Sequence, residues 1–217
     1  MAIDSPTIPP QVTGLHLLRL GYWKHHARNR RLARLANAIG TYDLAWLAEY
    51  APRVADWLAS RQLNHPPRVA VVAHTVDHVV ALAEHLRDWT VITDGDTANE
   101  PMLRRLQNRP RSWNLLGCLV TTTSGFDQVE IGGLDVIVFA GGGAFLPPLP
   151  RHKLICPAGD PRRLLVVDAD DHHQPQLCRW SRSRRIAYLD AGWCPVGADA
   201  QRVRVDAFFR RRPRNKR

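Results

Sequence analysis

Short runs of apolar residues recur along the middle and the end of the chain, separated by polar turns. These runs are rich in valine, isoleucine and leucine and are three to five residues long. Continuous apolar runs of this length are typical of strands that are buried on both faces of a parallel sheet. The pattern predicts strands at residues 69–73, 90–93, 118–122, 135–139, 153–156 and 164–168.

Helical spacing of apolar residues occupies the segments before and between these runs. Residues 14–39 are expected to form one helix that has an apolar face of Leu32, Leu35, Ala36 and Ile39, with Gly40 as its C-terminal cap. A second helical stretch covers residues 43–62 and should break at Pro52, because proline disrupts a helix interior. Further helices are predicted at residues 76–87, with Thr75 as N-cap, and at residues 101–107 and 176–189.

Strands that alternate with helices favour a three-layer α/β fold with a parallel sheet and right-handed crossovers. The predicted organisation has four parts. These are a flexible, proline-rich start at residues 1–13, a helical extension at 14–66, the α/β domain at 67–195 and a basic tail at 196–217.

Composition narrows the protein class. No window reaches the roughly 18 uninterrupted apolar residues of a membrane span, and the first residues lack the apolar core of a secretion signal, so we expect a cytoplasmic protein. The four cysteines have no Cys-x-x-Cys spacing and are expected to be free thiols. They are Cys118, Cys156, Cys178 and Cys194.

The formal net charge is +10, and the excess is clustered, which is typical of proteins that bind DNA or RNA. The first cluster is Lys24 to Arg34, in which Lys24, Arg28 and Arg31 form a predicted helical stripe, and the second is Arg179 to Arg185. The alternative for the first two clusters is that each is only a solvated helix face. The tail has eight basic residues against one acid after Gln201, which favours a phosphate-binding arm. In the second cluster Arg179, Arg182, Arg184 and Arg185 surround Trp180. The other candidate phosphate contacts are Arg182 and Arg185 there, and Arg210, Arg211, Arg212 and Arg214 in the tail.

A family resemblance rests on residues 117–143, where a strand ends in Thr122, Gly125-Phe126-Asp127 follows, and a second strand begins soon after. This segment resembles the fifth motif of superfamily 2 helicases. Residues 68–97 look like the opening of the same helicase domain, and residues 164–193 look like its last strand and final helix. The resemblance is to the second, C-terminal RecA-like domain in the excision-repair and restriction-type branch, and it implies a RecA-like sheet.

The resemblance implies that loops after the strands touch a nucleic-acid backbone. The residues at these positions are His74, Thr75, Thr121, Thr122 and Thr123. Short hydroxyl side chains beside free amides suit phosphate oxygens. The alternative is structural, because Thr75 can cap its helix and the threonine cluster can satisfy its own turn.

The resemblance covers only half of a complete helicase motor. No Gly-x-x-x-x-Gly-Lys-Ser/Thr loop or acidic magnesium motif occurs, and the sixth helicase motif is not found between residues 149 and 165. By resemblance, Gly125 and Asp127 would face ATP and magnesium only in a cleft completed by a partner. Arg162 and Arg163 are the candidates for an arginine finger acting in trans.

Two other groups of residues are weaker candidates for a binding site. The run of Asp168, Asp170, Asp171, His172 and His173 holds metal-ligand types, but acid-rich turns commonly cap the next helix, and no metal is predicted. The triple glycine at residues 141–143 is expected to be a plain turn, with close approach to a phosphate as the alternative. No self-contained active site is predicted.

The leading hypothesis is a nucleic-acid-binding accessory protein on a degenerate helicase C-terminal domain, without autonomous ATPase activity. Two alternatives remain. One is the C-terminal half of a split ATP-dependent helicase whose protein partner carries the phosphate loop, and the other is an interaction scaffold in a nucleoprotein complex.

Overall fold

The computed structural model describes residues 2–3, 8–61, 63–93, 118–128, 133–144, 164–191 and 193. Its centre is a five-stranded sheet in the order β3-β4-β2-β5-β6, and every neighbouring pair is parallel. The strands are β2 (Val69–Ala73), β3 (Thr90–Ile92), β4 (Cys118–Thr122), β5 (Val136–Phe139) and β6 (Leu165–Asp168). The predicted α/β class and parallel order are therefore confirmed, whereas a RecA-like identity stays a prediction.

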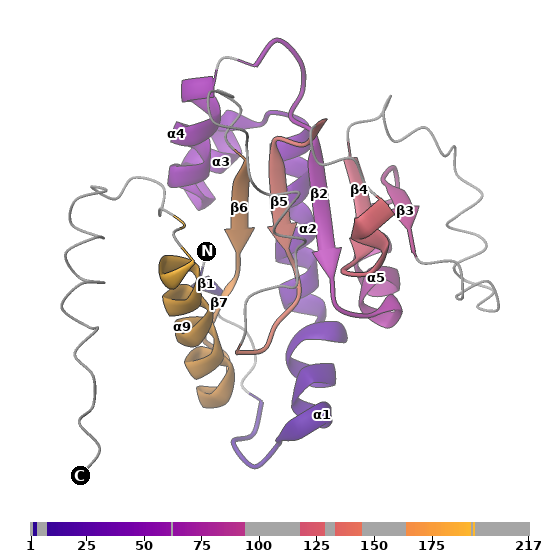
Figure 1. Cartoon of the computed structure of the whole chain (residues 1–217), viewed down its shortest axis with the longest axis vertical. Helices are drawn as coiled ribbons and strands as arrows, with labels where there is room; N and C mark the ends of the chain where they lie inside the picture. The colour runs from indigo at the N-terminus through magenta and orange to yellow at the C-terminus, as the bar shows by residue number, and fades with distance from the viewer. Residues whose placement is uncertain are drawn as a thin grey trace.

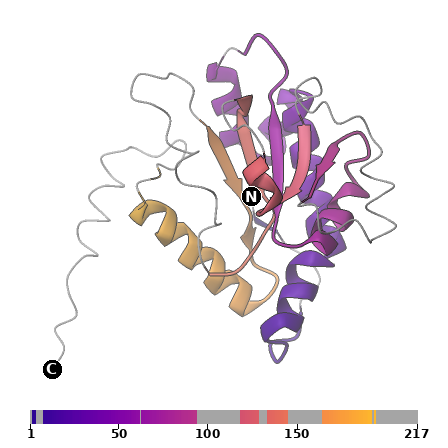
Figure 2. The same cartoon turned by 45° about the vertical axis from the view of Figure 1, so that its right-hand side comes forward.

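Six α-helices lie within the described residues, mostly against one face of the sheet (Figures 1 and 2). They are α1 (Gly14–Leu18), α2 (His26–Gly40), α3 (Leu44–Tyr50), α4 (Pro52–Arg61), α5 (Val76–Ala83) and α9 (Pro175–Asp190). Within the part of the chain that is described, none of them has the length and apolar character needed to cross a membrane.

The main hydrophobic core joins the first helices to the sheet. Leu35 and Ile39 of α2 and Leu82 of α5 pack in one cluster with Val69 and Val71 of β2. Alternate residues of β2 point to the opposite face and pack with Phe126 of the 3-10 turn η3 (Gly125–Gln128). Both faces of the central strand are thus buried, which is the reason for its uninterrupted apolar residues, Val-Ala-Val-Val-Ala.

The predicted helix at residues 14–39 is wrong as a single element. A π-helix, η1 (Arg19–Trp23), follows α1, and α2 begins only after His25, whose Nδ1 accepts a hydrogen bond from the Arg28 amide. The chain therefore turns between the two helices, and the ring of Tyr22 is fully buried. At the other end, Gly40 is the last helical residue and Thr41 is the C-cap.

Two further predictions need comment. The break at Pro52 is confirmed, since α3 ends at Tyr50 and α4 begins at Pro52. The start of the chain is not wholly unstructured, because the short strand β1 (Ala2–Ile3) pairs in parallel with β7 (Asp170–Asp171). The predicted helix at residues 101–107 and strand at residues 153–156 lie outside the described residues.

Candidate nucleic-acid interface

The carboxyl ends of the strands all lie at one edge of the sheet, near α1 (Figure 1). The chain leaves β2 towards β3 on one side and leaves β5 towards β6 on the other, so the connections diverge between β2 and β5. In open α/β sheets a crevice at such a divergence is the usual ligand site. The side chains around this point therefore decide what the sheet can bind.

Four consecutive carbonyl groups after β5 accept hydrogen bonds from basic side chains. Arg28 donates from Nη1 to the Ala140 oxygen at 2.7 Å and from Nη2 to the Gly141 oxygen at 3.0 Å. The ring Nε2 of His74 lies 2.8 Å from the Gly142 oxygen, and Nη1 of Arg184 donates to the Gly143 oxygen at 2.6 Å. The triple glycine is thus a turn held by two arginines and one histidine of this chain.

Glycine is needed in this turn because side chains press directly on its backbone. A Cβ on Gly141 would lie 2.7 Å from His74 Nε2, and a Cβ on Gly142 would overlap the buried ring of Tyr22. Gly143 has a φ of +96°, which L side chains rarely adopt. Tyr22 and His74 therefore pack against the turn that follows β5.

Two buried ion pairs stabilise the same edge. Arg28 and Asp171 are both fully buried, with Nε to Oδ1 at 2.7 Å and Nη2 to Oδ2 at 3.3 Å. Arg184 donates from Nε to Asp168 at 2.9 Å and from Nη2 to the Ala169 oxygen at 2.9 Å. The acidic run at residues 168–173 thus divides among separate partners, and His173 Nε2 lies 3.1 Å from the Gly21 oxygen.

Three histidines near this edge are held in their neutral form. Burial lowers the pKa of His25 to about 4, with smaller contributions from His173 and Arg28. Burial also lowers the pKa of His74 and takes that of His78 well below its usual range. A neutral ring suits His25, because its Nδ1 can accept the Arg28 amide proton only when that nitrogen is deprotonated.

The threonine positions named by the resemblance make local contacts. Thr75 is the N-cap of α5 and its hydroxyl accepts from the His78 amide at 3.3 Å. Thr122 Oγ1 accepts from the Gly125 amide at 2.9 Å, and Thr121 donates to the Thr122 oxygen at 3.2 Å. These bonds match the structural alternative of a cap and a self-satisfied turn.

The neighbouring candidates differ in exposure. Thr123 is half-buried, and its amide donates to the Ala73 oxygen at 3.0 Å. Gly125 is buried, and a Cβ there would lie 2.6 Å from the Thr121 hydroxyl. The side chain of Asp127 lies outside the described residues.

The predicted basic stripe is corrected at Arg28. Its side chain points into the protein and is fully occupied by Asp171 and the glycine turn, so no outside polymer reaches it. Lys24 and Arg31 are exposed as expected. Arg182 and Arg185 of α9 are exposed too, whereas the candidates Arg162, Arg163, Arg210, Arg211, Arg212 and Arg214 lie outside the described residues.

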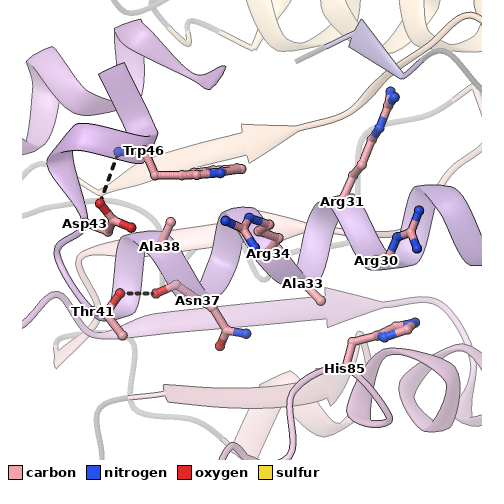
Figure 3. Close-up of a pocket in the computed structure, with 10 residues that line it drawn as sticks. All are labelled: Arg30, Arg31, Ala33, Arg34, Asn37, Ala38, Thr41, Asp43, Trp46 and His85. Carbon is pink, nitrogen blue, oxygen red and sulfur yellow. Dashed lines mark hydrogen bonds between the residues drawn. The ribbon is translucent and has the colours of Figure 1, made fainter. Parts of the chain in front are cut away.

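The outer face of α2 instead forms an open groove of about 530 Å³ with α3 and the segment after α5 (Figure 3). Figure 3 shows Trp46 from α3 on one side of the groove and His85 on the other, with arginines of α2 along it. We call this surface the α2 groove. It is lined by Arg30, Arg31, Ala33, Arg34, Asn37, Ala38, Thr41, Asp43, Trp46 and His85.

The α2 groove is strongly cationic. It holds three arginines against one acid, and that acid, Asp43, caps α3 by accepting from the Trp46 amide at 3.0 Å. A neighbouring hollow shares Arg30 and His85 and adds Lys24 and His26. Together the two hollows form one basic surface along α2.

Two of its arginines belong to the predicted basic cluster of residues 24–34 but not to the predicted stripe. Arg30 and Arg34 are exposed and lie four residues apart, so they share one face of α2. Helical spacing in the sequence already places both arginines opposite the apolar face of Leu32, Leu35 and Ile39. The guanidinium of Arg34 lies 5.4 Å from the centre of the Trp46 ring, within the range of a cation–π contact.

Comparison with known proteins gave no match to a family model, to a curated protein or to a solved structure.

Proposed function

We propose that this chain is a nucleic-acid-binding protein that holds a sugar-phosphate backbone on the α2 groove. The main support is that Arg30, Arg31 and Arg34 lie together in one open groove. The only acid that lines this groove, Asp43, caps helix α3. Contacts of this kind neutralise phosphates and release counterions without reading sequence.

The proposal moves the phosphate contacts away from the loops named by the resemblance. Tyr22 and His74 pack against the glycine turn after β5, while the hydroxyls of Thr75 and Thr122 accept hydrogen bonds from nearby backbone amides. The exposed arginines of α2, unlike Arg28, are not bound to the glycine turn. A polyanion therefore meets available charge on the helix and not at the strand ends.

The scaffold of the proposal is a degenerate C-terminal domain of a superfamily 2 helicase that acts as an accessory protein. The five-stranded parallel sheet is compatible with such a domain, and the resemblance of residues 117–143 supports it. We favour this role over a motor completed by a partner, because Gly125 packs behind Thr121 and Ile92 in the described structure.

Salt-dependent binding tests the proposed function. We would measure the affinity of a dye-labelled single strand by fluorescence anisotropy over a range of salt concentrations. Two double variants remove the same charge from different helices: R30A/R31A from the α2 groove and R182A/R185A from α9, all four arginines being exposed.

The expected result is a lower salt slope for R30A/R31A. Each lost phosphate contact reduces the slope by about 0.7 for a single strand, so the pair should reduce it by about 1.4 and weaken binding on the order of tenfold. R182A/R185A should change both quantities much less. Equal effects of the two variants, or a larger effect on α9, would reject the α2 groove as the site.

A further inference from the structure

A stacked aromatic pair borders the α2 groove. Trp46 and Tyr50 lie one turn apart on α3, with ring centres 4.8 Å apart and ring planes at 23°. Trp46 lines the groove and has the Arg34 guanidinium at 5.4 Å (Figure 3). Tyr50 extends the stack along α3 and is 53% exposed.

Core packing accounts for only part of this arrangement. Trp46 packs partly against the main core, but Tyr50 is more than half exposed. An aromatic pair at this spacing stabilises a helix by only about 0.2–0.5 kcal/mol. The stack therefore presents an aromatic ring to solvent beside the guanidinium of Arg34, with the Glu49 carboxylate at the Tyr50 hydroxyl.

A ligand that matches this surface must combine flat rings with negative charge. Bases of a single strand have free faces that stack on aromatic rings, whereas the bases of a duplex are stacked on one another and hidden. Along α2, Arg30 to Thr41 covers about 16 Å at 1.5 Å per residue. That length corresponds to about five stacked nucleotides at 3.4 Å each.

On the basis of the proposed function, we infer that the α2 groove prefers single-stranded over double-stranded nucleic acid, with bases stacked on Tyr50 and Trp46 and phosphates on Arg30 and Arg34. The aromatic stack supplies the preference for single strands. The arginines supply the charge-dependent part of the affinity.

Anisotropy with two labelled probes tests this inference: a single strand of ten deoxythymidines and a ten-base-pair hairpin. The matched variants are Y50A, which removes the outer ring, and Y50F, which keeps it. Tyr50 is exposed, so both should fold, which a thermal melt checks. Y50A should weaken single-strand binding roughly five- to 150-fold, from the usual contribution of one base–aromatic stack, and leave hairpin binding unchanged. Y50F should match the wild type.

A second readout reports stacking directly. A single strand that carries 2-aminopurine should lose fluorescence on binding to the wild type, and lose less with Y50A. Equal affinity for strand and hairpin together with no effect of Y50A would overturn the inference and leave the proposed function standing. Failure of the wild type to bind either probe would overturn both.

Discussion

Replacement of Arg28 by methionine should destabilise the fold more than any other change of a single arginine on α2. Methionine keeps helix propensity and most of the side-chain volume but removes the charge. The guanidinium makes four hydrogen bonds, two to Asp171 and one each to the Ala140 and Gly141 carbonyls. The variant leaves a carboxylate with no exposed surface and two buried carbonyls without this donor.

The expected cost is about 3 kcal/mol. Removal of one partner from a buried ion pair typically costs about 3–5 kcal/mol. The lower end applies because Arg184 Nη2 still lies 3.7 Å from Asp171 Oδ2. At a urea dependence of about 2 kcal/mol/M, the unfolding midpoint should fall by about 1.5 M.

The assay is urea unfolding followed by far-UV circular dichroism. R30M is the matched control, because Arg30 is exposed on the same helix and should cost less than about 0.5 kcal/mol. The double variant R28M/D171N should be more stable than the sum of its single variants predicts, since the unpaired charge is gone. A loss for R28M no greater than that for R30M would refute the reasoning.

Three further predictions concern the same edge of the sheet. G142A should lower the free energy of unfolding by about 1–3 kcal/mol, because the added methyl group overlaps the Tyr22 ring. The double variant G142A/Y22L should recover part of this loss. An unchanged melting temperature for G142A would contradict the packing. The folded-state pKa of His25, about 4, lies below its unfolded value, so stability is full above about pH 6.5 and falls as the pH drops towards 4. Its share is about 1–2 kcal/mol after allowance for its partial exposure, and H25N, which keeps a cap, should flatten the unfolding free energy between pH 7 and 5. T75A should cost about 1 kcal/mol in unfolding free energy while T75S costs little; weaker nucleic-acid binding by T75A at unchanged stability would instead indicate a phosphate contact.

Local patterns predicted the strands well. Residues 69–73 and 118–122 have the observed bounds, and β5 and β6 each begin one residue later than expected. These segments are β-branched runs, so their local preference and their burial favour the same structure. The short strand β1 was missed, because two residues in a proline-rich segment carry no readable period.

The error at Arg28 has an instructive cause. Residue 28 lies four positions before Leu32 and seven before Leu35, so helical spacing already placed it on the apolar face. Its charge was given more weight than its position. The partner that makes burial tolerable, Asp171, is 143 residues away, and no local pattern indicates it.

The contact between Tyr22 and Gly142 was equally beyond a local pattern. Nothing around Gly142 distinguishes a turn that receives a ring from an ordinary turn. The α2 groove was only partly predictable, since the arginines follow from helical spacing but the position of Trp46 depends on how α3 packs against α2.

The long-range contacts of Arg28 affect when the chain can complete its folding. Its guanidinium joins the first long helix to backbone 112 residues later and to a carboxylate 143 residues later. Loops of that length close slowly, and folding rates fall as such distant contacts dominate. During synthesis Arg28 cannot form these contacts, and its guanidinium stays hydrated, until nearly the whole described chain has left the ribosome. We therefore expect fragments that stop before β7 to leave Arg28 hydrated and without its Asp171 partner.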